Sequence, residues 1–562
     1  MATSIRESCA LVSLAFALLL APINATASPQ VLSEEAWRAD ILEMVATVKA
    51  NHPNAYLHTS EEDFDTAVEV LLSRLGDFDD KEIIVEMAKI IALVEDGHTR
   101  LSFPRQHNEL GFSFSHSKPK EPTDAALNFT SLPFRFSVLE GKLYIIEASE
   151  AYRHLLGAEV TAFGQTPSED ALKRLSSVNY NDNEMTDILL AGDRASLPDL
   201  LHALKITTSA EEIPLTLRKY DNGEAVEIIV SPLGDEPSAL VAPEASATPL
   251  WLIDKASPKW AKLLRKERAH FIQLNQIEGG MPDVMLADFM REEINKAKKA
   301  RAQKIIIDLR HNHGGSGGYS RSVVNAIAAS PYNEYGKFLI LIGRETFSAA
   351  GHLLTELEQY TDALFFGEPS GAAPDSYGDP KRIQLKNSGL DLRVSRLHWC
   401  AWRAFETRTA TAPHYPVAYT IDDYMTGRDP VLEAALTYKA PKGLAALIAD
   451  VSAATDHWDG AIILFSRFGT DPRILDRDLS KFAGEIIAEA QTLEAAGRDL
   501  PALFLYDIAR RLDDARAEAY LGWARTALAL GEQGEAENAV KAGLDALPDN
   551  EALLDLQATL AQ

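Results

Sequence analysis

The chain has 562 residues, more than one hydrophobic core usually holds, so we expect about three or four domains. Its share of hydrophobic residues, 46%, is ordinary for a globular protein and excludes an intrinsically disordered chain. The formal net charge of −27 excludes nucleic-acid binding through a general electrostatic attraction, because the phosphate backbone is also anionic.

The first 27 residues have the pattern of a secretory signal peptide. Arg6 gives a short basic start, residues 10–20 are apolar, and the Ala-Thr-Ala segment at 25–27 has the small-x-small pattern of a cleavage site. The alternative is an uncleaved N-terminal anchor, although the apolar run is short for a membrane span. No later run is long enough to span, so we expect a mature protein without a membrane span, periplasmic or secreted after cleavage near Ala27.

Cysteine is scarce in this chain. Cys9 lies in the signal segment, so Cys400 would be the only cysteine of the mature protein, which leaves no internal disulfide and no cysteine-based metal site. The tryptophans on either side, Trp399 and Trp402, favour burial of this unpaired thiol.

Residues 28–106 are predicted to form an N-terminal helical domain, because apolar residues recur at helical spacing from Trp37 to Val48 and again over 82–94. Residues 107–245 are predicted to be a polar linker followed by a β-rich domain, with strands at 142–146 and 159–163. Within it, the Leu-Gly-Ala-Glu-Val stretch at 156–160 resembles the signature of a PDZ domain, which holds an extended peptide by edge-strand addition. The alternative is a small β-rich insertion without a binding role.

Residues 246–438 are predicted to form an α/β core in which strands alternate with helices. The predicted strands are 271–274, 304–309 and 338–342, and the predicted helices are 283–299, 320–329 and 349–360. This alternation indicates a mostly parallel sheet covered by helices.

Residues 439–562 are predicted to be helical and contain an internal repeat with a period of 34 residues, the tetratricopeptide value. Small residues recur at matching places in the two copies: Ala490, Gly497, Ala502 and Ala509 in the first, and Ala524, Gly531, Ala536 and Gly543 in the second. The alternative is an ordinary Ala-rich helical bundle. Either architecture favours a docking surface for a protein partner over a catalytic role.

A glycine-rich turn follows the predicted strand at 304–309 and includes Gly314 and Gly315. Glycines let a backbone turn sharply and present its N–H groups, and such a turn at the carboxyl end of a parallel strand suits an oxyanion. A phosphate loop is a poorer match, because the Gly-Lys-Ser/Thr ending is missing. A purely structural turn is the other alternative. His311 and His313 lie in the same turn, where they could line a substrate groove.

Ser348 stands where the strand at 338–342 gives way to the helix at 349–360. The helix dipole would stabilise an oxyanion there, and the N–H of Ala349 could donate to it. The alternative is that Ser348 is only an N-cap, and the surrounding residues do not form a G-x-S-x-G nucleophile elbow. A lone histidine is usually structural, but His98, in the Glu-Asp-Gly-His-Thr-Arg segment at 95–100, is a candidate because a serine nucleophile needs a base.

These segments, in this order, resemble the family of tail-specific (C-terminal processing) peptidases, tricorn core peptidases and their retinoid-binding relatives. The likeness covers roughly residues 35 to 438 and includes two further matches, Gly-Glu-Pro-Ser-Gly at 367–371 and Gly-Arg-Asp-Pro-Val-Leu at 427–432. It implies a crotonase-like α/β core, Ser348 as the nucleophile, and neither a metal nor an organic cofactor.

The sequence departs from the family at two positions. Ala373 stands where tail-specific members carry a lysine base, so the resemblance implies instead the histidine base of the tricorn-like branch, which His98 matches. The serine that precedes this histidine in that branch is Gly97 here. Glu406 lies where the glutamate that orients the histidine is expected.

The resemblance therefore implies an exported serine-type peptidase that acts on peptide or protein substrates. Ser348 would form an acyl-enzyme, His98 would take its proton, and the N–H groups of Gly314, Gly315 and Ala349 would hold the oxyanion. One alternative is a catalytically degenerate protein that binds a peptide or an apolar ligand on the same fold. Another is a scaffold whose C-terminal helices recruit partners.

Overall fold

The computed structural model describes residues 31–107, 122–234, 239–244, 248–278, 284–334, 336–400, 406–439, 449, 451 and 483–560. The predicted signal peptide and most of the predicted linker lie outside this part of the chain. Within it, no helix combines the length and the apolar character that crossing a membrane requires.

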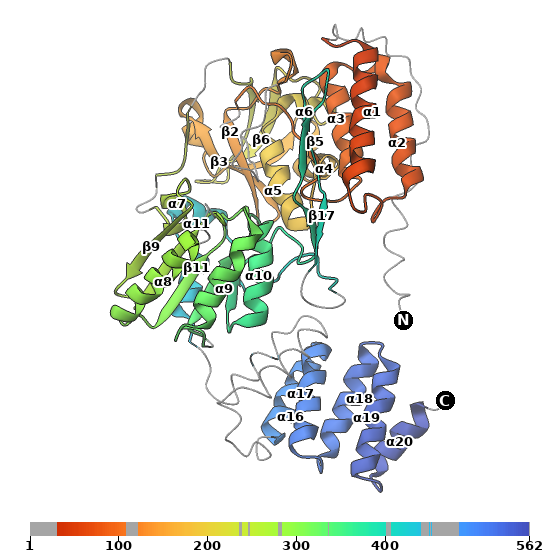
Figure 1. The fold of residues 1–562 in the computed structure, drawn as a ribbon, viewed down its shortest axis with the longest axis vertical. Helices are drawn as coiled ribbons and strands as arrows, with labels where there is room; N and C mark the ends of the chain where they lie inside the picture. Colours follow the sequence, from red (N-terminus) through yellow and green to blue (C-terminus); the bar gives the residue numbers. More distant parts are fainter. Residues whose placement is uncertain are drawn as a thin grey trace.

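Three packed helices open the described chain: α1 (Glu34–Asn51), α2 (Glu61–Ser73) and α3 (Asp80–Ala92), with a 3-10 turn η1 (Leu75–Asp77) between the last two (Figure 1). Side chains cap them at the start: Ser33 accepts the N–H of Ala36, and Asp79 forms a capping box with Glu82. The residues that recur at helical spacing in α1 are the buried ones, so the predicted helical domain is confirmed in its secondary structure.

The β-rich region is an antiparallel sheet in which the order of its main strands is β2-β3-β4-β6-β7. Its strands are β2 (Phe134–Leu139), β3 (Lys142–Ser149), β4 (Glu159–Phe163), β5 (Thr166–Pro167), β6 (Ile213–Arg218), β7 (Ala225–Val230) and β8 (Leu240–Val241). Its helices are η3 (Ala125–Leu127), η4 (Glu150–Leu155), α4 (Ser168–Ser176), α5 (Glu184–Arg194) and α6 (Pro198–Ala203). Strand β2 is the last strand at one end of this order. Helix α5 packs closely on it, because Gly192 of α5 lies against the backbone of Phe136.

The core is a six-stranded sheet of order β18-β13-β12-β11-β10-β9, parallel except for β9. Its strands are β9 (Lys259–Leu264), β10 (Ala269–Leu274), β11 (Lys304–Asp308), β12 (Phe338–Ile342), β13 (Leu364–Gly367) and β18 (Tyr415–Pro416). The associated helices are α7 (Leu250–Ile253), α8 (Val284–Lys299), η5 (Gly317–Tyr319), α9 (Ser320–Ala328), α10 (Ala349–Tyr360), α11 (Ile421–Thr426) and α12 (Pro430–Thr437).

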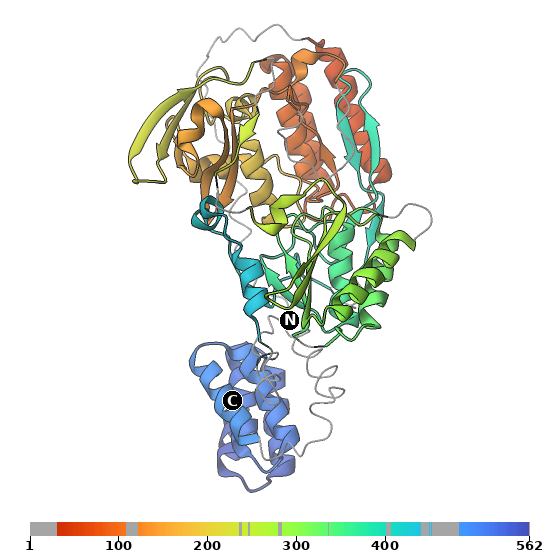
Figure 2. The same cartoon turned by 90° about the vertical axis from the view of Figure 1, so that its left-hand side faces the viewer.

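Both faces of this sheet are covered (Figures 1 and 2). Ile305 and Ile307 pack under α8, α9 and α10, whereas Ile306 packs on the opposite face with Val431 of α12. A strand buried on both sides is apolar on both faces, which is why residues 305–307 are three consecutive isoleucines. The predicted parallel α/β sheet is therefore confirmed.

The predicted unit at 246–438 does not fold entirely on itself. After β13 the chain forms β14 (Ser376–Gly378), β15 (Lys381–Gln384), β16 (Asp391–Val394) and β17 (Leu397–Trp399). Strand β16 pairs with β15 and with β1 (Arg100–Leu101), and Leu392 joins the hydrophobic cluster of the N-terminal helices. This pairing ties the segment after His98 to the chain between β13 and β18 of the core sheet.

Cys400 differs from its prediction, because it is exposed rather than buried. It follows the exposed strand β17, and its Sγ lies 3.4 Å from Nδ1 of His398. The neighbouring Trp399 is itself 41% exposed, so the tryptophan beside the thiol does not cover it.

The C-terminal region consists of α16 (Ala483–Ala495), α17 (Asp499–Leu512), α18 (Ala517–Ala529), α19 (Gln533–Ala546) and α20 (Glu551–Leu560). The end of α18 follows that of α16 by 34 residues, and the same offset separates the ends of α19 and α17. The predicted helical period is therefore present in the fold (Figure 1). Its use as a docking surface stays a prediction.

Candidate active site

Ser348 lies at the start of α10 in a conformation that non-glycine residues rarely adopt, with φ of 55° and ψ of −127°. Its side chain caps no helix N–H, so the N-cap alternative does not account for it. Instead its Oγ lies 2.9 Å from Nε2 of His98. Strain of this kind concentrates at functional sites, where the surrounding structure holds it in place.

His98 is held in the position that a general base needs. Its ring stacks on Phe347 with a centroid distance of 4.6 Å, and only 8% of the residue is exposed. Burial lowers the pKa of His98 to about 4, with the Asp96 carboxylate acting in the opposite direction. The ring is therefore neutral at pH 7, and with the proton on Nδ1 its Nε2 can accept a proton from Ser348.

Oδ1 of Asp96 lies 3.9 Å from Nδ1 of His98, too far for a hydrogen bond, and the backbone of Tyr377 also lies near the ring. Asp96 is 2% exposed, and burial alone would raise its pKa. A hydrogen bond from His52, the charge of His98 and a hydrogen bond from Ser395 outweigh burial and hold that pKa below its usual range. Asp96 is not among the predicted site residues, although it lies two residues before His98.

The structure does not bring Glu406 to His98, which corrects its predicted role. The Glu406 carboxylate accepts hydrogen bonds from Nε of Arg408 at 3.0 Å and from a terminal nitrogen of the same guanidinium at 2.8 Å. Arg408 also donates to Glu358 of α10. Glu406 is therefore held in an ion-pair network, and the carboxylate beside the His98 ring is Asp96.

Of the three predicted oxyanion donors, Gly314 is excluded because its N–H donates to the side-chain oxygen of Asn312 at 2.9 Å. In the described part of the chain, no hydrogen bond occupies the N–H of Gly315 or Ala349. The turn packs closely against Ser348: a β-carbon on Gly314 would lie 2.6 Å from Cβ of Ser348 and 2.8 Å from N of Ala349.

The backbone of Gly315 admits only glycine. Its φ of 134° is unfavourable for other residues, and a β-carbon would collide with the carbonyl oxygen of Ile277. Ile277 also fixes the turn, since its N–H donates to Gly314 and its carbonyl accepts from Ser316. Gly315 and Ala349 therefore remain as candidate oxyanion donors.

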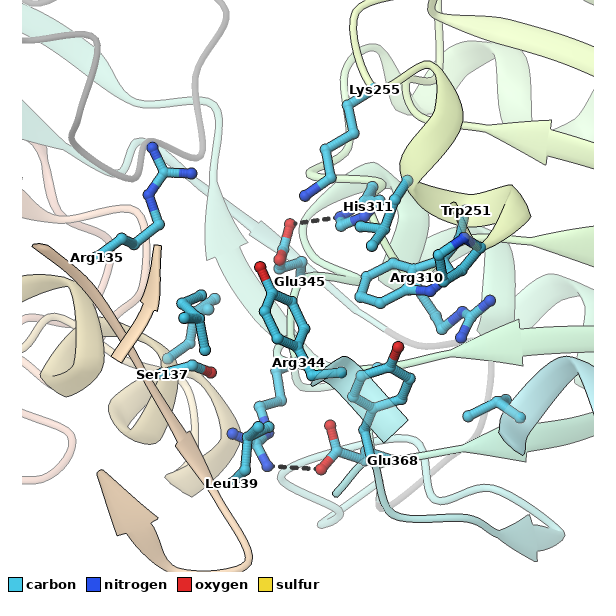
Figure 3. Close-up of a pocket in the computed structure, with 18 of the residues that line it drawn as sticks. Arg135, Ser137, Leu139, Trp251, Lys255, Arg310, His311, Arg344, Glu345 and Glu368 are labelled. Carbon is cyan, nitrogen blue, oxygen red and sulfur yellow. Dashed lines mark hydrogen bonds and ion pairs between the residues drawn. The ribbon is translucent and has the colours of Figure 1, made fainter. Parts of the chain in front are cut away.

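A cavity of about 1050 Å³ separates the β2–β3 edge from the core sheet (Figure 3). Arg135, Ser137 and Leu139 form one wall, and Trp251 and Glu345 lie on the opposite wall. The lining includes the histidines of the glycine-rich turn, and Glu345 precedes Ser348 by three residues, whereas Ser348 and His98 are outside the lining. The cavity is thus beside the Ser348–His98 pair and not around it.

The packing around Gly97 explains why this position does not hold the serine of the tricorn-like pattern. A β-carbon at this position would lie 2.7 Å from the Phe347 ring and 2.9 Å from Oδ1 of Asp182, so a serine has no room. The Gly97 N–H donates to the same Asp182 oxygen at 2.7 Å. His98 is therefore oriented here without a preceding serine.

We expect Gly97→Ser to destabilise the protein by about 1–3 kcal/mol, because an overpacked core displaces its neighbours, here the ring that stacks on His98. Urea unfolding measures this change. Gly534→Ser is the matched control, because a side chain there meets open space. Equal unfolding midpoints for the two variants would contradict the steric argument.

The buried Asp182 carboxyl should make the stability of the fold depend on pH. Burial and the nearby Asp96 charge raise the pKa of Asp182 to about 7, above its unfolded value of about 3.9. A raised folded pKa means that ionisation disfavours the fold, with a cost that grows from about pH 4 and levels off above about pH 7.

Asp182→Asn should therefore raise the thermal midpoint more at pH 8 than at pH 4.5, while its amide oxygen can still accept the Gly97 N–H. Differential scanning calorimetry at both pH values tests this. The exposed Asp549→Asn should change neither midpoint, and an equal gain from Asp182→Asn at both pH values would exclude the buried charge as the cause.

Among the described residues, no group of three or more His, Cys, Asp and Glu side chains is arranged to hold a metal ion.

No protein-family model and no curated protein matches the sequence. Solved structures similar to the chain include mature CPAF complexed with lactacystin, with a TM-score of 0.47 and 12% identity, covering 70% of this chain and 96% of that one. The photosystem II D1 C-terminal processing protease is similar with a TM-score of 0.32 and 12% identity, covering 71% and 99%. Tricorn protease is similar with a TM-score of 0.29 and 11% identity, covering 72% and 36%.

Proposed function

We propose that this protein is a serine-type peptidase in which Ser348 is the nucleophile and His98 the general base. The observation that carries the proposal is the 2.9 Å contact between Ser348 Oγ and His98 Nε2, made by a serine in a strained backbone conformation. A serine hydroxyl becomes nucleophilic when an adjacent neutral imidazole can take its proton.

The proposed reaction is acyl transfer in two stages. Ser348 Oγ attacks the carbonyl carbon of the peptide bond as its proton passes to Nε2 of His98, and the N–H groups of Gly315 and Ala349 stabilise the oxyanion. The imidazolium then protonates the leaving amine as the C–N bond breaks. In the second stage His98 takes a proton from a water molecule, which attacks the acyl-enzyme. The imidazolium then returns the proton to Ser348 Oγ as the ester bond breaks.

The proposed seat of the substrate is the edge of β2. Among the described strands it pairs with β3 alone, and its residues 135–139 line the cavity together with Glu345 of the loop before Ser348. An extended peptide can add to such an edge through main-chain hydrogen bonds, as in PDZ-like recognition. A peptide seated there would lie beside the catalytic pair. The crotonase-like identity of the core is part of the same proposal.

Export belongs to the proposal too and rests on the signal-peptide pattern of residues 1–27.

The test is fluorophosphonate labelling of the purified mature protein, with the modified residue mapped by mass spectrometry and peptide hydrolysis assayed on the same sample. Labelling at Ser348 together with hydrolysis that the probe abolishes is the expected result. A folded protein that neither reacts nor hydrolyses would overturn the proposal, and a ligand-binding protein on this fold would then be the reading to test.

A further inference from the structure

We propose that Asp96 is the positioning carboxylate for His98, and that His52 and Ser395 hold Asp96 in place for that task. This inference rests on the proposed function and assigns the role that Glu406 does not fill. It places a third group, from the same short segment as the base, behind the imidazole.

The two oxygens of Asp96 face different partners. Oδ1 faces His98: it accepts the backbone N–H of that residue at 2.9 Å and lies 3.9 Å from ring Nδ1. Oδ2 faces away and accepts hydrogen bonds from Ser395 Oγ at 2.6 Å and from His52 Nε2 at 3.2 Å. The carboxylate is thus fixed at both oxygens with one edge toward the imidazole.

The tautomer of His52 is defined by its other nitrogen. The backbone N–H of Asn54 donates to Nδ1 of His52 at 3.1 Å, so in the neutral ring the proton is on Nε2, where it can be donated to Asp96. The ring is 8% exposed and lies 4.7 Å from the Tyr377 ring. His52 also ends α1, with its own N–H donating to Val48. It is therefore a rigid donor.

Ser395 is delivered by the chain that follows β16. Ser395 is fully buried. Its backbone N–H donates to Thr99 Oγ1 at 3.0 Å, which fixes the residue, and its hydroxyl donates to Asp96. Three parts of the chain therefore meet at one carboxylate: the end of α1, the segment around His98, and the end of β16.

The electrostatic consequence appears when His98 takes the serine proton. The imidazolium then forms beside a buried carboxylate that its donors keep ionised. Other nearby charged or titratable groups act differently, because Arg100 and His352 disfavour the imidazolium and Asp182 lies close enough to Asp96 for their charges to repel. Asp96 is thus the carboxylate whose charge, 3.9 Å from Nδ1, can stabilise the imidazolium and favour the tautomer with the proton on Nδ1.

The decisive variant is Asp96→Asn, which keeps the shape and removes the charge. We expect the rate of Ser348 labelling by a fluorophosphonate to fall about 10²- to 10⁴-fold. His52→Gln retains a donor near the Nε2 position and should restore most of the rate that His52→Leu loses, which loss of folding alone would not produce. An Asp96→Asn variant that folds and labels at the wild-type rate would overturn the inference and leave the Tyr377 backbone as the orienting group.

A second measurement separates this inference from the proposed function. NMR titration of the His98 imidazole in Ser348→Ala needs no activity, and adding Asp96→Asn should lower the pKa of His98 because Asp96 raises it. An unchanged pKa of His98 would contradict the inference even if the serine labels. A lowered pKa of His98 in a protein that does not label would support the positioning role and refute the peptidase.

Discussion

Ser348→Ala is expected to abolish fluorophosphonate labelling and to lower kcat for peptide hydrolysis by about 10⁵-fold or more, the scale seen when a nucleophilic serine is removed. The Ser348 hydroxyl forms no helix-capping hydrogen bond and lies within hydrogen-bond distance of Nε2 of His98. Removing the hydroxyl should therefore lower the reaction rate and change the free energy of unfolding little. The measurement is labelling and hydrolysis at matched protein concentration, with circular dichroism as the folding check.

The matched control is Ser322→Ala on α9, whose hydroxyl donates to the backbone of Tyr319. It should label and hydrolyse as wild type does. Labelling that persists in Ser348→Ala would assign the reactive serine elsewhere, and hydrolysis that persists without labelling would point to a contaminating enzyme or to a different nucleophile.

His98→Ala should reduce the labelling rate of Ser348 by about 10⁴-fold, because the serine loses the group that takes its proton. In wild type the rate should rise as pH passes through about 4, since burial lowers the pKa of His98 to about 4 and only the neutral ring is a base. Above that range the rate should stay level to neutral pH. The variant should lack this rise, which a stopped-assay series from pH 3.5 to 8 would reveal.

The control for this variant is His352→Ala. His352 is another histidine near the site, and burial also lowers its pKa to about 4, but its Nε2 faces Ser376 Oγ at 3.3 Å and not Ser348. Its removal should change the labelling rate less than about tenfold. If both histidine variants lose the same activity, His98 has no special role as base.

The sequence predicted the elements around the site well, for physical reasons that are local. Residues 338–342 and 349–360 were predicted as a strand and a helix, and the structure has them as β12 and α10 with the same bounds. A continuous apolar run bounded by turn residues defines a buried strand, and the following helix shows its own period. Ser348 and His98 are predicted because their segments resemble those of a peptidase family, and the fold brings the two residues into contact across 250 residues.

The errors concern groups whose roles depend on one neighbour. Gly314 and Gly315 are indistinguishable in a glycine-rich turn, and only the side chain of Asn312 decides which N–H is occupied. The position of Glu406 in the sequence suits a carboxylate that orients His98, but its side chain is bound by Arg408, two residues later. Asp96 was overlooked because its environment is built by residues far away in the sequence. Such contacts leave no periodic signal.

The pairing of β16 with β1 has a consequence for when the protein can act. His98 is synthesised long before Ser348, and the chain must continue to Ser395 before the carboxylate behind the base has its donors. Contacts of such sequence separation form late in folding, because a large loop must close first. A nascent or unfolded chain therefore carries every reacting group and yet lacks the site. For the exported peptidase proposed above, this order of assembly would delay activity until the chain has folded.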